Sequence, residues 1–290
     1  MVDNIKMTKT YLGQNFLYDP SILKKIVEAA QLNTEDLVVE IGPGHGSLTK
    51  MLAEEARKVI AIELDEELFR NLAKELAGYE NVELICKDAL KYPYEQLSKF
   101  KAVANIPYYI TTPLIFRLLE IGRTQPVDTQ RAKEIIPPRP PLANMESVDY
   151  KVKKNLESMT LTVQKEVAER IAAGPGGKDY GVLSIMVQYY AKPGLEFIIP
   201  KGAFRPVPKV DSAVVHFKVL ERPSVNVDNE KFFFSLVKTA FSQRRKFLSN
   251  SLKSFSGDVK EWLTNAGIDP KRRPETLSIE EFAMLANSHH

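Results

Sequence analysis

The sequence predicts an α/β fold, in which a doubly wound and mostly parallel sheet is followed by a smaller helical domain. Apolar runs of strand length alternate with amphipathic runs of helix length over the first two-thirds of the 290-residue chain, which is typical of parallel sheets. Beyond Glu221 the pattern changes to helical periodicity alone. We therefore expect a sheet domain at 1–221, a boundary between Glu221 and Val225, and a helical domain at 225–290.

Each expected element follows from its own pattern. A helix starts after Asp19-Pro20, because an Asp cap before Pro is typical of a helix start. Short apolar runs rich in Val and Ile predict strands, and runs with apolar residues three to four apart predict helices. The strands are expected at 36–41, 58–65, 82–90, 101–108, 195–200 and 212–219. The helices are expected at 20–32, 47–56, 66–76, 113–121, 161–173, 229–255, 258–267 and 278–287.

Composition excludes several classes of protein. The single cysteine, Cys86, excludes a disulfide framework and a multi-cysteine zinc site, which fits a cytoplasmic protein. The chain has no long uncharged apolar run, so we expect no membrane span. Residues 200–275 carry 15 Lys and Arg against 8 Asp and Glu, a basic excess that suits a polyanion such as nucleic acid. On charge alone, a solvated helical face explains the excess better than a nucleic-acid partner does.

Polar or glycine residues follow three successive predicted strands. Gly42, Gly44 and Gly46 come after the first strand and before a helix, where missing side chains let the backbone approach a ligand. Their G-x-G-x-G spacing differs from G-x-G-x-x-G and argues against a dinucleotide site. Glu63 ends the second strand, where a ribose would present its hydroxyls, and Asp88 ends the third, where it could accept from an adenine amine. Taken singly, each residue is also explained by a tight turn or a solvent-facing carboxylate.

The stretch NIPYYI, residues 105–110, follows the fourth predicted strand. Asn and Pro are both turn residues, so an ordinary turn with aromatic core residues would explain it. The alternative is a pocket that holds a flat base and its exocyclic amine. These residues alone leave both interpretations open.

Eight motifs occur in the order of one known family. They are GQNFL, VVEIGPGHGSLT, IELD, KDAL, NIPYYI, QKEVAER, FRPVPKVDSAVV and FSQRRKFLSNSL. From about Tyr11 to Leu285 the chain resembles the ribosomal RNA adenine N6,N6-dimethyltransferases of the KsgA/RsmA type, with the Erm resistance methyltransferases as relatives. The resemblance implies a Rossmann-like, S-adenosylmethionine-dependent methyltransferase sheet at 1–221 and a helical RNA-docking domain at 225–290.

The resemblance also implies a cofactor, S-adenosyl-L-methionine, and its contacts. The methionine end of the cofactor would meet the GQNFL motif and the glycine turn, and the next two strand ends would hold the ribose and the adenine. In this order the implied cofactor-binding residues are Gln14, Asn15, Leu17, Gly42, Gly44, Glu63, Asp88, Ala89 and Asn105.

The chemistry implied at NIPYYI concerns the N6 amine of an adenine, a poor nucleophile because its lone pair is delocalised. The side-chain oxygen of Asn105 and a backbone carbonyl of Ile106 or Pro107 would accept from its two hydrogens, and Pro107 would keep the segment rigid. Tyr108 and Phe204 would cover the two faces of the base, and each stacking contact is worth about 1–3 kcal/mol. No metal and no strong general base is required.

For RNA docking, the candidates are Arg244, Arg245 and Lys246, which we expect on a basic helix. The expected activity is methyl transfer to two adjacent adenines of small-subunit rRNA in a pre-30S particle, by a monomer with a role in ribosome maturation. Two alternatives are Erm-like methylation of large-subunit rRNA and a non-catalytic RNA-binding factor. The segment 124–154 departs from the family pattern and is either a lineage-specific insertion or an engineered graft.

Overall fold

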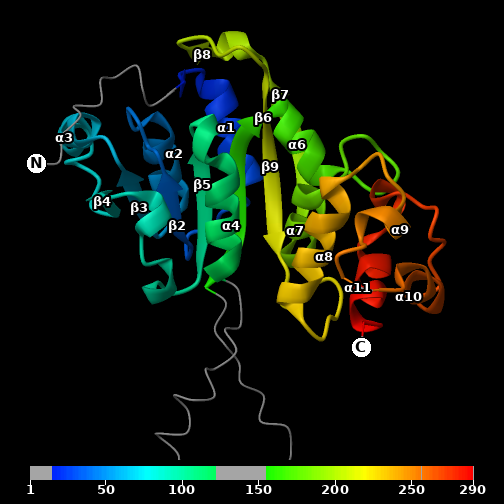
Figure 1. The fold of residues 1–290 in the computed structure, drawn as a ribbon. Coiled ribbons are helices and arrows are strands. Elements are labelled where there is room, and N and C mark those ends of the chain that lie inside the picture. Colours follow the sequence, from blue (N-terminus) through cyan, green and yellow to red (C-terminus); the bar gives the residue numbers. More distant parts are fainter. Residues whose placement is uncertain (1–14, 122–154, 256, 290) are drawn as a thin grey trace, which may run out of the picture.

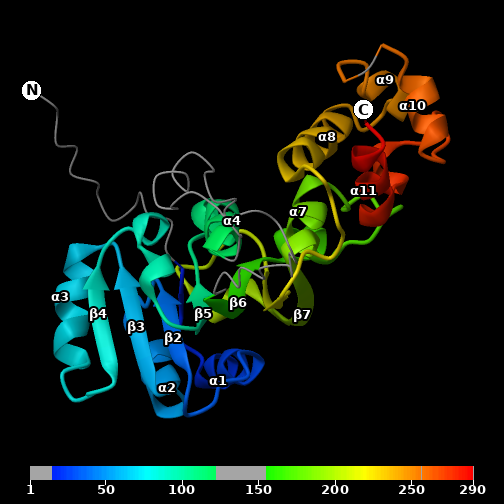
Figure 2. The same ribbon diagram turned by 90° about the horizontal axis from the view of Figure 1, so that it is seen from below.

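The computed structural model describes residues 15–121, 155–255 and 257–289 (Figure 1). Gln14 and the segment 124–154 therefore lie outside the described residues. The expected α/β architecture is confirmed. A seven-stranded sheet, in the order β4-β3-β2-β5-β6-β9-β7, carries helices on both faces (Figure 2).

Five strands of this sheet are parallel: β2 (Leu37–Ile41), β3 (Lys58–Glu63), β4 (Val82–Cys86), β5 (Phe100–Asn105) and β6 (Leu156–Gln164). Two antiparallel strands, β9 (Ser212–Val219) and β7 (Ala191–Ile199), complete it beside β6. A separate two-stranded ribbon pairs β1 (Phe16–Leu17) with β8 (Phe204–Arg205). Because the parallel strands share one direction, the ends of β2, β3, β4 and β5 lie along one edge of the sheet.

The helices in chain order are α1 (Pro20–Ala29), α2 (Ser47–Glu55), α3 (Glu66–Glu75), α4 (Thr111–Ile121), α6 (Lys165–Ala172), α7 (Val182–Tyr190), α8 (Glu230–Ser242), α9 (Leu248–Ser251), α10 (Val259–Asn265) and α11 (Ile279–Asn287). The start predicted for α1 is confirmed. Asp19 caps it by accepting from the Ser21 N–H at 2.9 Å, and Pro20 occupies the first turn.

Two sequence-based expectations about elements were wrong. The helix expected at 161–173 begins only at Lys165, because the residues before it form the end of β6. That strand is buried between β5 and β9, so its apolar residues carry no alternation that would mark it as a strand. The helix expected at 229–255 is broken: α8 ends at Ser242, and a turn separates it from the short α9.

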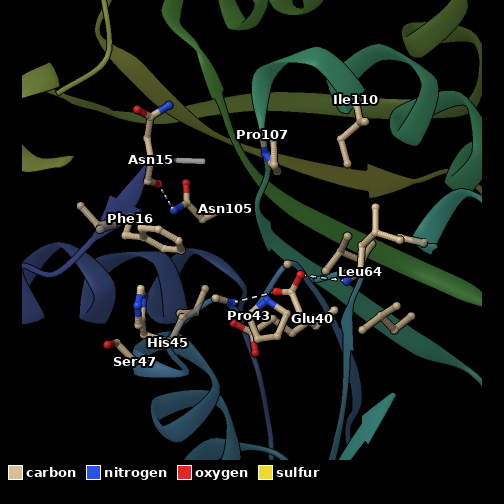
Figure 3. A pocket seen from close by; sticks show the side chains of 18 of the residues that line it. Asn15, Phe16, Glu40, Pro43, His45, Ser47, Leu64, Asn105, Pro107 and Ile110 are labelled. Atoms are coloured by element: carbon tan, nitrogen blue, oxygen red, sulfur yellow. Dashed lines mark hydrogen bonds between the residues drawn. The ribbon is translucent and has the colours of Figure 1, made fainter. Parts of the chain in front are cut away.

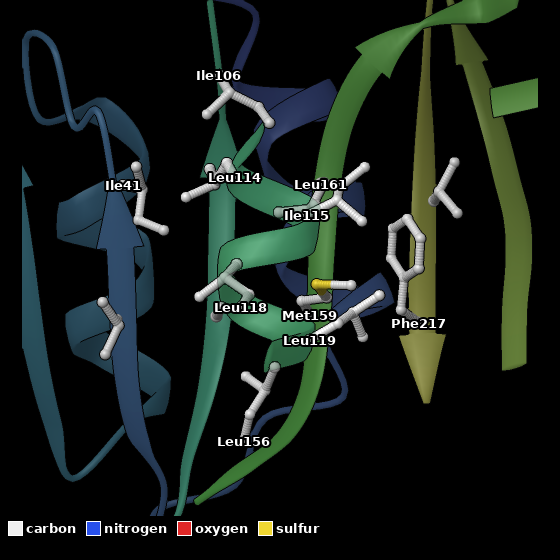
Figure 4. Packing of buried hydrophobic residues seen from close by; sticks show 14 of the residues in the cluster. Ile41, Ile106, Leu114, Ile115, Leu118, Leu119, Leu156, Met159, Leu161 and Phe217 are labelled. Atoms are coloured by element: carbon white, nitrogen blue, oxygen red, sulfur yellow. The ribbon is translucent and has the colours of Figure 1, made fainter. Parts of the chain in front are cut away.

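Hydrophobic packing holds the layers together. On one face of the sheet α4 packs Leu114, Ile115 and Leu118 against Ile41 and Met159 (Figure 4). On the other face α1 and α2 pack against alternate residues of the same strands. Side chains along β2 point alternately to the two faces of the sheet, so Val38 and Glu40 lie on the face that α1 and α2 cover.

A third hydrophobic cluster unites the C-terminal helices. It contains Phe233, Trp262 and Phe282, and it also includes Tyr180 and Ile185 from the region of α7. Residues on both sides of the boundary expected near residues 221–225 thus pack in one hydrophobic cluster. The division into domains at 1–221 and 225–290 stays a prediction. Within the described part of the chain, no helix is long and apolar enough to cross a membrane.

Candidate active site

A cavity opens at the sheet edge where the parallel strands end. Its wall is built from the glycine loop after β2, the ends of β3 and β4, the segment after β5, and β1 (Figure 3). Among the residues of this wall are Asn15, Leu17, Gly42, Gly44, Glu63, Asp88, Ala89, Asn105 and Pro107. The structure therefore brings together all the described residues that the sequence suggested for a cofactor.

The glycine loop adopts a backbone conformation that other residues rarely take. Gly42 and Gly44 have φ values of +69° and +58°, in the left-handed region. At Gly44 a Cβ would lie 2.9 Å from the Phe16 ring, so a side chain there would displace the aromatic residue. Around Gly42 no atom lies within 4 Å of such a Cβ, which leaves the backbone open towards the cavity.

Glu63 is buried at the end of β3, with 3% of its surface exposed. Its Oε1 accepts from the backbone N–H groups of Leu64 and Asp65 at 2.8 and 2.9 Å, and its Oε2 accepts from Gly44 N–H at 3.3 Å. Burial raises the pKa of Glu63, and these N–H groups oppose the rise. Since a carboxylate oxygen can accept two hydrogen bonds, Oε2 has room for one more donor, such as a ribose hydroxyl.

Glu40 is a second buried acid in the wall, and sequence reasoning gave it no role. It is 1% exposed, and its Oε2 has no hydrogen-bond partner, nor has the hydroxyl of neighbouring Thr49. Burial raises the pKa of Glu40 to about 8, and the nearby charge of Glu63 adds to the rise. The Thr49 hydroxyl lies close enough to oppose the rise, although its geometry does not meet that of a hydrogen bond. A buried polar atom without a partner is costly, so this oxygen marks a place where a donor from a ligand would be stabilised.

Asp88 and Ala89 form the wall beyond the end of β4. Asp88 caps a short 3-10 helix, and its Oδ1 accepts from Leu90 N–H at 2.9 Å. Its other oxygen faces the exposed Lys91 ammonium at 3.7 Å, too far for a hydrogen bond. That oxygen can accept from a ligand amine, as expected for an adenine.

Asn105, the last residue of β5, connects the cavity to the β1 ribbon. Its Nδ2 donates to the backbone carbonyl of Asn15 at 3.4 Å (Figure 3). This bond orients the amide group, whose side-chain oxygen is the atom that can accept from a ligand. The Pro107 carbonyl accepts from Ile110 N–H at 3.2 Å, which makes the Ile106 carbonyl the better candidate for a second acceptor.

Tyr108 lies beside this segment but outside the cavity wall. It starts a short 3-10 helix (Tyr108–Ile110), and its hydroxyl shares a hydrogen bond of 2.8 Å with the hydroxyl of Ser212. Burial raises the pKa of Tyr108, against a lowering effect of the Ser212 bond. Ser212 is fully buried at the start of β9. Sequence reasoning missed Ser212, although it lies inside the quoted motif FRPVPKVDSAVV.

Phe204 does not lie at the cavity. It pairs with Leu17 in the β1–β8 ribbon, is 1% exposed, and packs in the cluster with Leu23 and Ile199. The ring presents no face to the cavity in this arrangement. Its expected role, covering one face of the base, stays a prediction that this structure does not support.

The basic residues 244–246 lie on the turn between α8 and α9, not on a helix as expected. Arg244 donates from Nη2 to the carbonyls of Lys178 and Tyr180 at 2.8 and 2.9 Å, and its guanidinium lies 5.8 Å from the Phe241 ring centre. Arg244 thus ties the turn to the residues before α7. Arg245 and Lys246 are exposed and lie far along the chain from the cavity wall.

The wall also contains aromatic residues that sequence reasoning did not assign. Phe16, Tyr18 and His45 lie on the β1 side, and Tyr109, which is 57% exposed, lies beside Pro107. Phe16 and Tyr109 stand inside quoted motifs, so the signal for them was present. No local pattern indicates the contact between the glycine loop and β1 that brings His45 to Phe16.

The donor and acceptor groups of the wall fit S-adenosylmethionine. This cofactor carries an ammonium, two ribose hydroxyls and an adenine amine, all of which donate hydrogen bonds. The cavity offers acceptors in three places: the unpartnered Glu40 oxygen, Oε2 of Glu63, and the outer oxygen of Asp88. The left-handed glycine loop provides the close backbone approach that an amino-acid end requires.

Comparison with known proteins agrees with this chemistry. The family model described as ribosomal RNA adenine dimethylase matches residues 5–290. A protein of Clostridium botulinum (strain ATCC 19397 / Type A) named ribosomal RNA small subunit methyltransferase A is 46% identical over 284 residues, covering 95% of this chain and 92% of that protein. One of the same name from Alkaliphilus oremlandii is 43% identical, covering 96% and 90%.

Two solved structures resemble this chain over more than nine-tenths of its length. The 23S rRNA methyltransferase ErmE superposes with a TM-score of 0.69 at 25% identity, covering 95% of this chain and 99% of that one. A dimethyladenosine transferase from Plasmodium falciparum gives the same TM-score at 28% identity, covering 93% and 95%.

Proposed function

The chain belongs to the ribosomal RNA adenine dimethylase family, and we propose that it transfers methyl groups from S-adenosylmethionine to N6 of two adjacent adenines in small-subunit rRNA. The product is N6,N6-dimethyladenosine, and the modification has a role in ribosome maturation. The observation that carries the proposal is the position of Asn105. Asn105 is the last residue of β5 and lies in the wall of the cofactor cavity, directly before Ile106-Pro107-Tyr108. Its side chain would therefore contact both the cofactor and the adenine that is methylated.

Bound in the cavity, the cofactor supplies a methyl group that is already activated by its sulfonium. The remaining task is to make N6 nucleophilic and to position it. The Asn105 side-chain oxygen and the Ile106 carbonyl accept from the two hydrogens of the amine, which draws the nitrogen towards a tetrahedral geometry with a localised lone pair. The Asn15 carbonyl fixes the Asn105 amide by accepting from its Nδ2, so the oxygen is already oriented before substrate binds.

Tyr108 provides one face for the adenine to stack on. It lies next to Pro107 but off the cofactor cavity, which is the side from which a base would enter. The hydrogen bond to buried Ser212 holds the ring in a fixed orientation. The proton released after methyl transfer passes to solvent, because Asn105 is uncharged.

The contacts to the cofactor follow from the geometry of the wall. Glu63 accepts from the ribose through Oε2, and Asp88 and Ala89 face the adenine. Asn15, Leu17, Gly42 and Gly44 lie along the methionine end. We propose that the enzyme acts as a monomer.

For docking on the pre-30S particle we propose phosphate contacts from Arg245 and Lys246 on the exposed turn after α8. Arg244 stabilises that turn through its hydrogen bonds to the backbone carbonyls of Lys178 and Tyr180. We also propose that the enzyme acts in the cytoplasm.

One alternative is methylation of large-subunit rRNA, which the likeness to the 23S rRNA methyltransferase ErmE supports. The identity of 46% to a protein named for the small subunit favours the small-subunit substrate over that alternative. A non-catalytic RNA-binding factor is disfavoured, because Asn105, Pro107 and Tyr108 are all present and placed together.

The test is methyl transfer from radiolabelled cofactor to 30S subunits that lack the modification, with 50S subunits and naked DNA in parallel. We expect label in 30S rRNA only, as dimethylated adenine after nuclease digestion. Asn105→Ala should nearly abolish the transfer while cofactor binding survives in weakened form. Label in 50S subunits alone would establish the large-subunit alternative, and wild-type turnover in Asn105→Ala would refute the acceptor mechanism.

A further inference from the structure

We propose that Phe16, Tyr18 and His45 form a stacking platform for the base of a nucleotide next to the methylated adenine. The proposal rests on the proposed function, because it takes the substrate to be a single-stranded segment of rRNA. It adds a contact for a second nucleotide, distinct from the stacking of the reacting adenine on Tyr108.

The three rings form one cluster, although they come from two separate segments. The centres of the Phe16 and His45 rings are 4.3 Å apart, with an interplanar angle of 74°. The Tyr18 ring lies 5.9 Å from His45 and 6.5 Å from Phe16. Phe16 and Tyr18 belong to β1 and the loop after it, whereas His45 belongs to the glycine loop.

The glycine loop leaves space for the aromatic cluster. A Cβ at Gly44 would lie 2.9 Å from the Phe16 ring, so the ring fits only because residue 44 has no side chain. The Gly44 N–H in turn donates to Glu63, which fixes the loop to the end of β3. The aromatic rings are therefore supported by the same residues that shape the cofactor cavity.

The cluster is placed beside the reacting groups and is open to solvent. Tyr18 is 48% exposed, and His45 is exposed as well. Phe16 directly follows Asn15, whose carbonyl accepts from the Asn105 amide. In Figure 3 Phe16 and His45 lie on one side of Asn105, and Pro107, which leads into Tyr108, lies on the other.

This arrangement favours a nucleotide base as the occupant. Proteins that recognise single-stranded RNA stack its unpaired bases on aromatic side chains, and every base offers a flat face for this. The reacting adenine lies against Tyr108 on the far side of Asn105, so the base within reach of Tyr18 and His45 is that of a neighbouring nucleotide. Two adjacent adenines are modified in the proposed reaction, and holding the second while the first reacts would keep both near the site.

The experiment compares steady-state KM for 30S subunits that lack the modification with the calorimetric Kd for S-adenosylmethionine. Tyr18→Leu keeps an apolar side chain but removes the ring, and it should raise the KM by about 5-fold to 150-fold. Tyr18→Phe, which keeps the ring, should recover most of that loss. His45→Ala should raise the KM in the same direction with the cofactor at saturation. Because both rings also border the cofactor cavity, the cofactor Kd is measured for each variant, and it should change by a smaller factor than the KM. Met284→Ala, at an exposed apolar residue of α11, serves as the control for a general loss of apolar surface.

The outcomes distinguish a failure of the stacking platform from a failure of the proposed function. If the wild-type protein methylates 30S subunits and Tyr18→Leu leaves the KM unchanged, the platform is refuted while the proposed function stands. A weaker cofactor Kd with an unchanged KM would assign the rings to the cofactor and also refute the platform. A wild-type protein that methylates no ribosomal particle would overturn the proposed function and the platform together.

Discussion

Removing the Tyr108 hydroxyl should destabilise the protein more than removing the hydroxyl of its partner, Ser212. The two oxygens share one hydrogen bond of 2.8 Å, but their surroundings differ. Ser212 is fully buried, whereas Tyr108 is half-buried and borders solvent. In Ser212→Ala, water can solvate the remaining Tyr108 hydroxyl, so the cost is that of one neutral hydrogen bond, about 0.5–1.5 kcal/mol.

In Tyr108→Phe the Ser212 hydroxyl remains in the interior without its partner. Leaving a buried donor and acceptor unsatisfied costs about 1–3 kcal/mol. The double variant removes both groups and should cost less than the sum of the single changes, because the bond is lost only once.

The assay is urea-induced unfolding of the wild type, the two single variants and the double variant. Their free energies of unfolding are compared with one shared value for the dependence on urea concentration. The same set should show the functional consequence: Ser212→Ala raises the KM for 30S subunits and leaves the cofactor Kd unchanged, since Tyr108 lies outside the cofactor cavity. Ser212→Thr, which retains a hydroxyl, should restore part of the lost substrate affinity. Strictly additive losses, or a larger loss for Ser212→Ala than for Tyr108→Phe, would refute this account of the pair.

Three further predictions concern charged groups. Glu63→Ala should weaken cofactor binding by about 1.5–3 kcal/mol, because it removes a charge-assisted hydrogen bond to the ribose; calorimetry with unchanged affinity would exclude Glu63 from the site. Burial raises the pKa of Glu40 to about 8, from an ordinary value of 4.5, so the folded cofactor-free protein keeps a proton that the unfolded chain releases. The free energy of unfolding should therefore fall as pH rises from about 5 to 8, and Glu40→Gln should remove that part of the dependence in denaturation curves. Changing Arg245 and Lys246 to Ala should reduce the slope of log affinity for subunits against log salt by about 0.7–0.9 per lost contact, whereas Arg244→Ala should chiefly lower the Tm; equal salt slopes in wild type and double variant would exclude the turn as an RNA contact.

Much of the sheet domain could be predicted from the sequence, because its strands and helices carry strong local patterns. The β2 strand, the glycine loop and α2 follow from a buried apolar run, three closely spaced glycines and helical periodicity. Since parallel strands end at one edge, the meeting of Gly42, Glu63 and Asp88 was also predictable. The local signal failed at β6, whose burial on both faces removes the alternation that identifies a strand.

The parts of the site that could not be predicted depend on contacts between distant segments. Nothing local to Ser212 indicates that its hydroxyl meets Tyr108, 104 positions earlier. Burial of Phe204 against β1 likewise arises from pairing with the N-terminal ribbon, not from its own neighbours in sequence. For Glu40 the sequence shows an acid in a strand, but the absence of a partner for its Oε2 is a property of packing alone.

The pairing of β1 with β8 has a consequence for the time at which the enzyme becomes competent during its own synthesis. Leu17 pairs with Phe204, so the segment that carries Asn15 cannot reach its final place until residues nearly two hundred positions later have left the ribosome. At about 5–20 residues per second, roughly 10–40 s separate the synthesis of these two strands. Throughout that interval β1 has no β8 to pair with, so the pairing that holds the Asn15 carbonyl beside Asn105 is missing. An incomplete chain, still attached to a working ribosome, would thus be unable to methylate the ribosomal RNA around it.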